Sequence, residues 1–378
     1  PRSTLFPYTT LFRSLHDIEK RLVGIFANYR AKPFACGLTD VGDYAPKTYV
    51  PVRGGSAKGE PVHPGFLSIL GGGDTPPDGF ERPTTGPIPL APTTGRRKAL
   101  AEWIASPANP LTARVMVNRI WQYHFGKGLV STPSDFGTRA RGPSHPELLD
   151  YLAAEFVQAG WSVKAIHRLI LNSAAYRQAA TANPRDPENT YLTYFSRRRL
   201  DAEELRDSTL DATLRLNRAR GGRPVVPPLS KEEMFGMIGR ASESWVLTAD
   251  ETQHRRRSIY LIQKRTFRLP MLEVFDQPES MLTCSRRDHS TTAPQALTLL
   301  NGSFVLEQAR AFAAQLVAQP NPVEAAWRAI LRRDPSPEET RSAQDFLARQ
   351  TTNTGSPALA AAELVRGLLN TNEFLYLD

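Results

Sequence analysis

The chain has 378 residues, of which 40% are hydrophobic and 22% are charged, a composition typical of a globular protein that can bury a sizeable core. No apolar run reaches the ~18 residues that a membrane-spanning helix needs, so no transmembrane segment is predicted. The formal net charge of +9 favours an anionic partner, although arginine-rich proteins are often basic without one.

The first fourteen residues do not fit the pattern of the rest of the chain. Their sequence, PRSTLFPYTTLFRS, resembles the translation of a common sequencing adapter. We therefore interpret residues 1–14 as a non-native leader and expect the native N-terminus to lie upstream.

Residues 15–94 are predicted to be the end of a preceding domain followed by a connector. A helical pattern covers 15–30, and short strands are expected at 34–44 and 48–53. Residues 54–95 are rich in Pro and Gly, which predicts an irregular connector because such a composition buries little apolar surface. The main domain is expected at 95–378, beginning with a helix over 95–106.

The central stretch of the main domain is predicted to contain three helices. The first has Val117, Ile120, Trp121 and His124 on one face, with Asn109-Pro110 as its cap and Gly126 as its end. The next two helices are separated by a short turn, which predicts an αα-hairpin. The first helix of this hairpin is expected to start at a capping box from Ser144 to Glu147, and the second at a cap at Ser162. On the first of the two, Leu148, Leu152, Phe156 and Ala159 are predicted to form one apolar face.

Further helices and one strand are predicted downstream. Asp201 and Glu204 have the spacing of a capping box, and residues 257–264 (RSIYLIQK) have the β-branched and aromatic content of a strand. Helices are expected at 270–275, 291–301, 303–316, 322–331, 337–350 and 357–370. The predicted fold is therefore mainly α, an α+β class with a few short strands, with a small β and irregular piece at the N-terminus.

Six stretches in order resemble one known family. They are VNRIWQYHFGKGLV (117–130), RRRLDAEELRDSTL (197–210), RRSIYLIQKRTFRLPMLEVFDQPES (256–280), RRDHSTTAPQALTLLNGSFVLEQA (286–309), AILRRDPSPEET (329–340) and LLNTNEFLYLD (368–378). Together they resemble the planctomycete-type domain of unknown function 1553. The resemblance implies a C-terminal domain, preceded by the tail of another planctomycete domain, in exported proteins linked to a cytochrome c module. It implies a periplasmic or cell-surface location and assigns no activity to any residue.

Three residues around the central stretch are weak candidates for chemistry. His124, Asp135 and His145 are predicted at helix ends or in loops, where imidazole and carboxylate could perform acid–base work. No two of these histidines have i, i+4 spacing, and the chain has no HExxH or CxxC motif, so no metal site is predicted. Structural capping is the alternative, and whether the chain is an enzyme stays open.

A charged cluster precedes and enters the helix that begins near 201. Arg199, Glu203, Arg206 and Asp207 contain i, i+4 pairs that would stabilise a helix. The alternative is a buried network in which arginine forks hold an anionic substrate. We favour the structural interpretation.

Paired arginines are the candidates for ligand binding. Arg256, Arg257, Arg286 and Arg287 are expected to form one positive surface for acidic polysaccharide. Burial in ion pairs is the alternative, with acidic partners at Asp276, Glu279 and Asp288. Nucleic acid is a less favoured partner, because the second helix of the predicted hairpin offers few base-reading groups.

Cysteine usage excludes covalent haem in this chain. Its two cysteines, Cys36 and Cys284, are far apart, and no CxxCH motif occurs. By resemblance, haem c could belong to an upstream module, and a redox partner could follow from it. The leading hypothesis is a domain that binds or processes acidic polysaccharide. The alternatives are a hydrolase-like enzyme with a His/Asp/Arg pocket and a nucleic-acid-binding protein.

Overall fold

The computed structural model divides the chain into two compact units, residues 1–109 and 110–378. It describes residues 17–18, 21, 47–51, 58–62, 65–70, 95–235, 245–265 and 267–377. The predicted leader 1–14, the predicted strand 34–44 and most of the predicted helix 15–30 lie outside the described residues. The predicted domain boundary at residue 95 stays a prediction.

The first unit contains a small antiparallel strand pair. Strand β1 (Thr48–Pro51) pairs with β2 (Lys58–Val62), and the register shifts between Tyr49 and Pro51. The strand predicted from residue 48 is confirmed, but β2 and the short 3₁₀ helix η1 (Ser68–Leu70) lie in the predicted irregular connector. Prolines are tolerated in a two-stranded sheet because both strands are edges. Helix α2 (Arg96–Ile104) follows.

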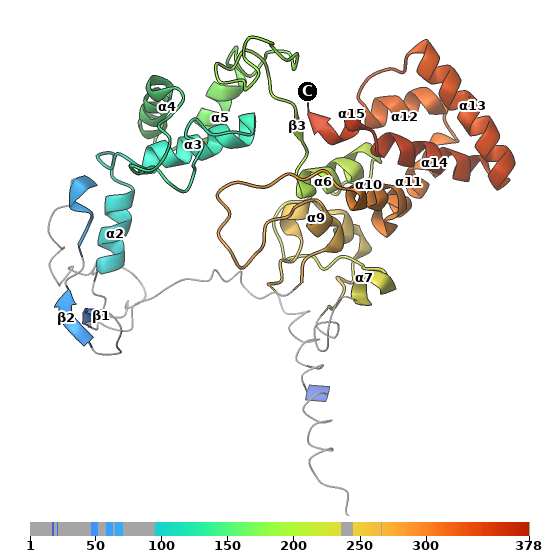
Figure 1. Cartoon of the computed structure of the whole chain (residues 1–378). Coiled ribbons are helices and arrows are strands. Elements are labelled where there is room, and N and C mark those ends of the chain that lie inside the picture. Colours follow the sequence, from blue (N-terminus) through green and yellow to red (C-terminus); the bar gives the residue numbers. More distant parts are fainter. Residues whose placement is uncertain are drawn as a thin grey trace, which may run out of the picture. The chain divides into compact units, whose positions relative to one another are not determined.

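The second unit begins with three helices, α3 (Thr112–Phe125), α4 (Pro146–Gln158) and α5 (Val163–Leu171), as Figure 1 shows. They enclose a core of their own, and α4 and α5 form the predicted hairpin. The turn contains Gly160 and Trp161, both with positive φ. The buried core residues are Ala113, Val117, Ile120, Trp121, Phe125, Leu129, Val130, Leu149, Leu152, Ala153, Phe156, Ile166 and Ile170.

Two of the four predicted helix ends in this region are wrong. The N-cap of α3 is Leu111, without a side-chain hydrogen bond, and Asn109 instead donates to the Trp103 carbonyl at 3.3 Å. The N-cap of α4 is His145, also without a side-chain bond, so the predicted capping box from Ser144 does not form. Ser162 does cap α5, and Gly126 ends α3 in the left-handed conformation.

The middle of the second unit is built around α6 (Ala202–Ala212). Its capping box between Asp201 and Glu204 is confirmed. Ahead of it, β3 (Arg198–Arg199) pairs antiparallel with β4 (Tyr376–Leu377), which joins this region to the C-terminal end of the described chain. Short elements follow, namely α7 (Lys231–Phe235), η2 (Glu251–Arg255), η3 (Ser258–Tyr260) and α9 (Pro270–Val274).

The strand predicted at 257–264 is wrong. This segment contains η3 and makes a single parallel bridge between Leu261 and Val225. Val225 donates to the Tyr260 carbonyl at 2.7 Å, and Ile262 donates to the Val225 carbonyl at 2.9 Å. The pairing stops there because Pro224, Pro227 and Pro228 flank Val225 and have no N–H group to extend a ladder.

The C-terminal helices complete the fold. They are α10 (Ala293–Asn301), α11 (Ser303–Leu316), α12 (Pro322–Ile330), α13 (Pro337–Thr354), α14 (Pro357–Leu369) and α15 (Asn372–Leu375). Helix α14 packs against both α11 and α13 (Figure 1). The core they share with α6 and α9 includes Leu205, Leu272, Val305, Phe312, Trp327, Val365 and Leu369. The prediction of a mainly α fold with a few short strands is confirmed.

Candidate functional site

His124 lies at the end of α3 and contacts a second histidine that the sequence did not suggest. Its Nε2 atom is 2.7 Å from Nδ1 of His167 on α5, and the ring of Tyr176 meets it edge-on. Burial lowers the pKa of His124, and the nearby His167 and Arg198 lower it further. The neutral form of His124 is therefore favoured in this contact with His167.

This lowered pKa predicts a pH-dependent stability. The unfolded chain binds a proton near pH 6.5 while folded His124 resists it, so stability should fall as the pH drops below about 6.5. We expect thermal melts between pH 7.5 and 5.5 to show a smaller loss for His124→Gln than for the wild type. His145→Gln is the control, and an unchanged slope for His124→Gln would contradict the assignment.

The other two predicted residues, Asp135 and His145, contact residues near them in the sequence. Asp135 accepts a hydrogen bond from the Gly137 amide at 2.8 Å, and His145 Nδ1 lies 3.0 Å from the Ser144 hydroxyl. Within the described part of the chain, neither residue forms a hydrogen bond or an ion pair with His124. Among the same residues, no group of three His, Cys, Asp or Glu side chains could hold a metal ion.

The predicted four-arginine surface is wrong for Arg256. That side chain is 3% exposed, donates to the Ala219 and Gly221 carbonyls and stacks on the Tyr260 ring. Arg287 is half-buried and forms an ion pair with Glu203 at 2.5 Å, rather than with the partners suggested by the sequence. Arg257 and Arg286 are exposed.

The predicted charged cluster is divided among three sets of partners. Arg199 lies in β3 and binds Asp276 at 2.7 Å, so the expected Arg199–Glu203 helix pair does not form. Glu203 binds Arg287. Arg206 and Asp207 both reach the segment that follows η2. All of these contacts join separate segments, whereas the favoured interpretation expects pairs within one helix.

Arg206 is the most buried of these charges and supports one wall of a pocket. Its guanidinium donates to the His254 carbonyl at 2.7 Å, the Arg256 carbonyl at 2.9 Å and the Ser258 hydroxyl at 3.2 Å. Burial lowers the pKa of Arg206 to about 10, so the side chain stays charged at neutral pH. These bonds fix the turn η2 against α6.

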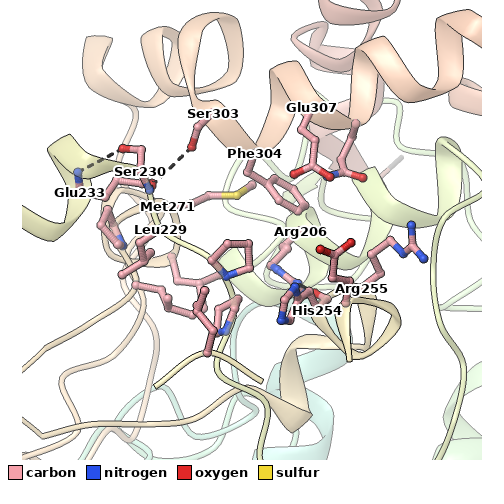
Figure 2. Close-up of a pocket in the computed structure, with 18 of the residues that line it drawn as sticks. Arg206, Leu229, Ser230, Glu233, His254, Arg255, Met271, Ser303, Phe304 and Glu307 are labelled. Carbon is pink, nitrogen blue, oxygen red and sulfur yellow. Dashed lines mark hydrogen bonds between the residues drawn. The ribbon is translucent and has the colours of Figure 1, made fainter. Parts of the chain in front are cut away.

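The pocket, called here the α11 pocket, has a volume of about 450 Å³. It is lined by Arg206, Arg215, Pro227, Pro228, Leu229, Ser230, Glu233, Leu247, Glu251, His254, Arg255, Leu269, Pro270, Met271, Leu272, Ser303, Phe304, Glu307 and Gln308. Figure 2 shows Phe304 and Glu307 extending from α11 toward Arg206, His254 and Arg255, with Leu229 and Met271 at the other end. Arg206, His254 and Arg255 thus lie toward one end of the pocket, whereas the other end combines Leu229 and Met271 with Ser230, Glu233 and Ser303.

Several polar groups of the α11 pocket are held by protein partners. Ser230 and Glu233 form a reciprocal cap at the start of α7, and the Ser303 hydroxyl donates to Glu233 at 3.4 Å (Figure 2). Arg215 Nη1 lies 3.1 Å from a carboxylate oxygen of Glu307, with which it forms an ion pair. His254 Nε2 lies 2.7 Å from the Thr248 carbonyl, which requires the proton on Nε2 and leaves Nδ1 unprotonated in the neutral ring.

The α11 pocket was not predicted from the sequence. The neighbouring Arg256 and Arg257 were candidates for a surface, but nothing in the sequence placed Arg255 in a cavity. One usable signal was Gln308, a polar residue on the apolar face of α11 between Val305 and Phe312. The other was the capping spacing of Ser230 and Glu233.

Comparison with known proteins identifies the family. A family model described as a protein of unknown function (DUF1553) matches residues 96–347, which is well over half of the chain. No curated protein and no solved structure matches the chain significantly. Within the described residues, no helix is long and apolar enough to cross a membrane. The chain therefore belongs to the DUF1553 family of proteins of unknown function.

Proposed function

We propose that the α11 pocket binds the carboxylate of an acidic sugar, so that the domain recognises acidic polysaccharide. The observation that carries the proposal is that the side chain of Arg255 lines the pocket without a protein partner in the described part of the chain. Among the described residues, no ion pair or hydrogen bond involves the Arg255 guanidinium, whereas Arg206 donates to three protein acceptors and Arg215 lies 3.1 Å from Glu307. An unpaired guanidinium at the wall of a pocket suits a planar carboxylate, which it can bind with two parallel hydrogen bonds.

The remaining walls of the α11 pocket support a sugar ring. Phe304, Met271 and Leu229 supply an apolar surface on which the C–H face of a ring can pack. A volume of about 450 Å³ lies in the range of small-molecule sites, which combine apolar walls with a few placed polar groups. The positive net charge of the chain would also attract an anionic polymer.

The wider setting of the domain is also part of the proposal. By family resemblance, the chain belongs to an exported protein in the periplasm or at the cell surface, with a haem c module upstream and a redox partner. The upstream coding sequence tests this, because a signal peptide and a CxxCH motif would support it and their absence would contradict it.

Titration with a galacturonic acid oligosaccharide tests the binding function. We expect the wild-type chain to bind it more tightly than a neutral galactose oligosaccharide, with affinity falling as salt rises. Arg255→Gln should weaken binding about tenfold, because a charge-assisted bidentate contact is lost. Isothermal titration calorimetry at two salt concentrations gives both results.

Two control variants locate the site. Arg349→Gln removes an exposed arginine of α13 and should leave affinity unchanged. Arg257→Gln combined with Arg286→Gln removes the exposed arginines of the surface suggested by the sequence. If this double variant loses affinity and Arg255→Gln does not, the surface binds the glycan and the pocket does not. Release of reducing ends during the titration would indicate the hydrolase alternative.

A further inference from the structure

Gln308 is a buried amide in the wall of the α11 pocket with an unsatisfied acceptor. It lies on α11, is 1% exposed, and its neighbours on the same face are apolar core residues. Its Oε1 atom is buried and accepts no hydrogen bond. Since nearly all buried polar side-chain atoms in proteins have a partner, an acceptor left free beside a cavity points to a group that enters the cavity.

Several other polar groups of the α11 pocket already have protein partners. The Ser303 hydroxyl donates to Glu233, and the Ser230 hydroxyl accepts from the Glu233 amide. Arg206 gives its hydrogen bonds to the His254 and Arg256 carbonyls and to Ser258. Within the described chain, Oε1 of Gln308 receives no hydrogen bond, which leaves this acceptor for a group that enters the pocket.

We infer that Gln308 accepts a hydrogen bond from a ligand hydroxyl, so that the α11 pocket selects hydroxylated acids over carboxylates without hydroxyl groups. This inference rests on the proposed function, in which Arg255 binds the carboxylate of the same ligand. The selection arises because a ligand without a hydroxyl leaves the buried Oε1 without a partner, whereas a sugar acid satisfies it. Uronic acids carry both groups on one ring.

Two small carboxylates of similar size separate the two contacts. We expect the wild-type chain to bind sodium galacturonate at least tenfold more tightly than sodium cyclohexanecarboxylate, which has a ring and a carboxylate but no hydroxyl. Gln308→Leu should abolish this preference, mainly by weakening galacturonate. Gln315→Leu, an exposed position on the same helix, is the matched control and should retain it.

The same variant has a second readout that a merely structural glutamine would not give. Gln308→Leu removes an unsatisfied buried acceptor from the ligand-free protein, so its melting temperature should equal or exceed that of the wild type. Binding and stability are thus expected to change in opposite directions. If Gln308→Leu does not fold, Gln308→Met keeps the length of the side chain and replaces it in the same assay.

The outcomes distinguish this inference from the proposed function on which it rests. If both carboxylates bind equally to the wild type and to the Gln308 variant, the role of Gln308 is overturned and the carboxylate site stands. If neither carboxylate binds, both are overturned. A Gln308→Leu chain that is less stable and still prefers galacturonate would show that the amide serves the fold alone.

Discussion

Replacing Arg206 by alanine is expected to lower the free energy of unfolding by about 3–5 kcal/mol. Arg206 is 5% exposed, and its guanidinium donates to two backbone carbonyls and to the Ser258 hydroxyl. Its removal would leave these buried acceptors without donors and would leave Asp207, 3.5 Å away, without its cation. The ring of Phe304 would also lose the cation that lies over it.

Thermal and urea denaturation of the chain measure this effect. For a domain of this size, we expect the melting temperature to fall by on the order of 10 °C. Arg206→Lys should recover only part of the loss, since one ammonium group cannot reproduce the fork that meets three acceptors. Arg349→Ala, at an exposed position, is the control. Wild-type stability of Arg206→Ala would show that water replaces the guanidinium without cost.

The same substitution should affect the α11 pocket. Arg206 bonds to the carbonyl of His254, the residue that precedes Arg255, and so fixes the turn that presents the free guanidinium. In Arg206→Lys, the variant that retains more of the fold, galacturonate affinity should therefore fall although Arg255 is intact. This result would show that the hydrogen bonds of Arg206 contribute to ligand binding in the α11 pocket.

Replacing Arg199 by alanine is expected to lower the free energy of unfolding by about 3 kcal/mol or more. Arg199 is 8% exposed and joins β3 to the segment between α9 and α10. It binds Asp276 at 2.7 Å, donates to Gln295 at 3.0 Å and donates to the Ser290 carbonyl. Asp276 has a positive φ and also accepts two hydrogen bonds from Ser290, so the arginine neutralises a carboxylate held in a fixed place.

The neighbouring Arg198 provides a matched control. It forms a bidentate pair with Glu204, but the Glu204 side chain is 43% exposed, so Arg198→Ala should cost about 1 kcal/mol. Urea denaturation of both variants gives the comparison. Equal losses would mean that burial of the Arg199 network adds nothing to its strength.

A pH scan adds a further check on the Arg199 network. Burial raises the pKa of Asp276, but the hydrogen bonds from Ser290 and Arg199 outweigh burial and lower this pKa. The contribution of Asp276 should be lost as the pH falls below about 4.

The helices and the fold class followed from the sequence. Period 3.6 patterns and capping residues act within a few positions, so the capping box of Asp201 and Glu204, the cap at Ser162 and the end at Gly126 were predictable. The ordered family blocks agreed with the matched family. Where the local rule met a competing contact, as at Asn109, the prediction failed because the side chain binds the Trp103 carbonyl instead of α3.

The strand assignment and the α11 pocket depended on distant partners. Residues 257–264 have strand-like side chains, but the segment that meets them contains prolines and allows one bridge. Arg256 and Arg255 are adjacent in a basic run, yet Arg256 is buried on the Tyr260 ring and Arg255 lines the pocket. Gln308 reaches that pocket from α11, about fifty positions away. Sequence pattern determines which local structures form, whereas exposure, pairing and cavities arise only when segments far apart in the chain pack together.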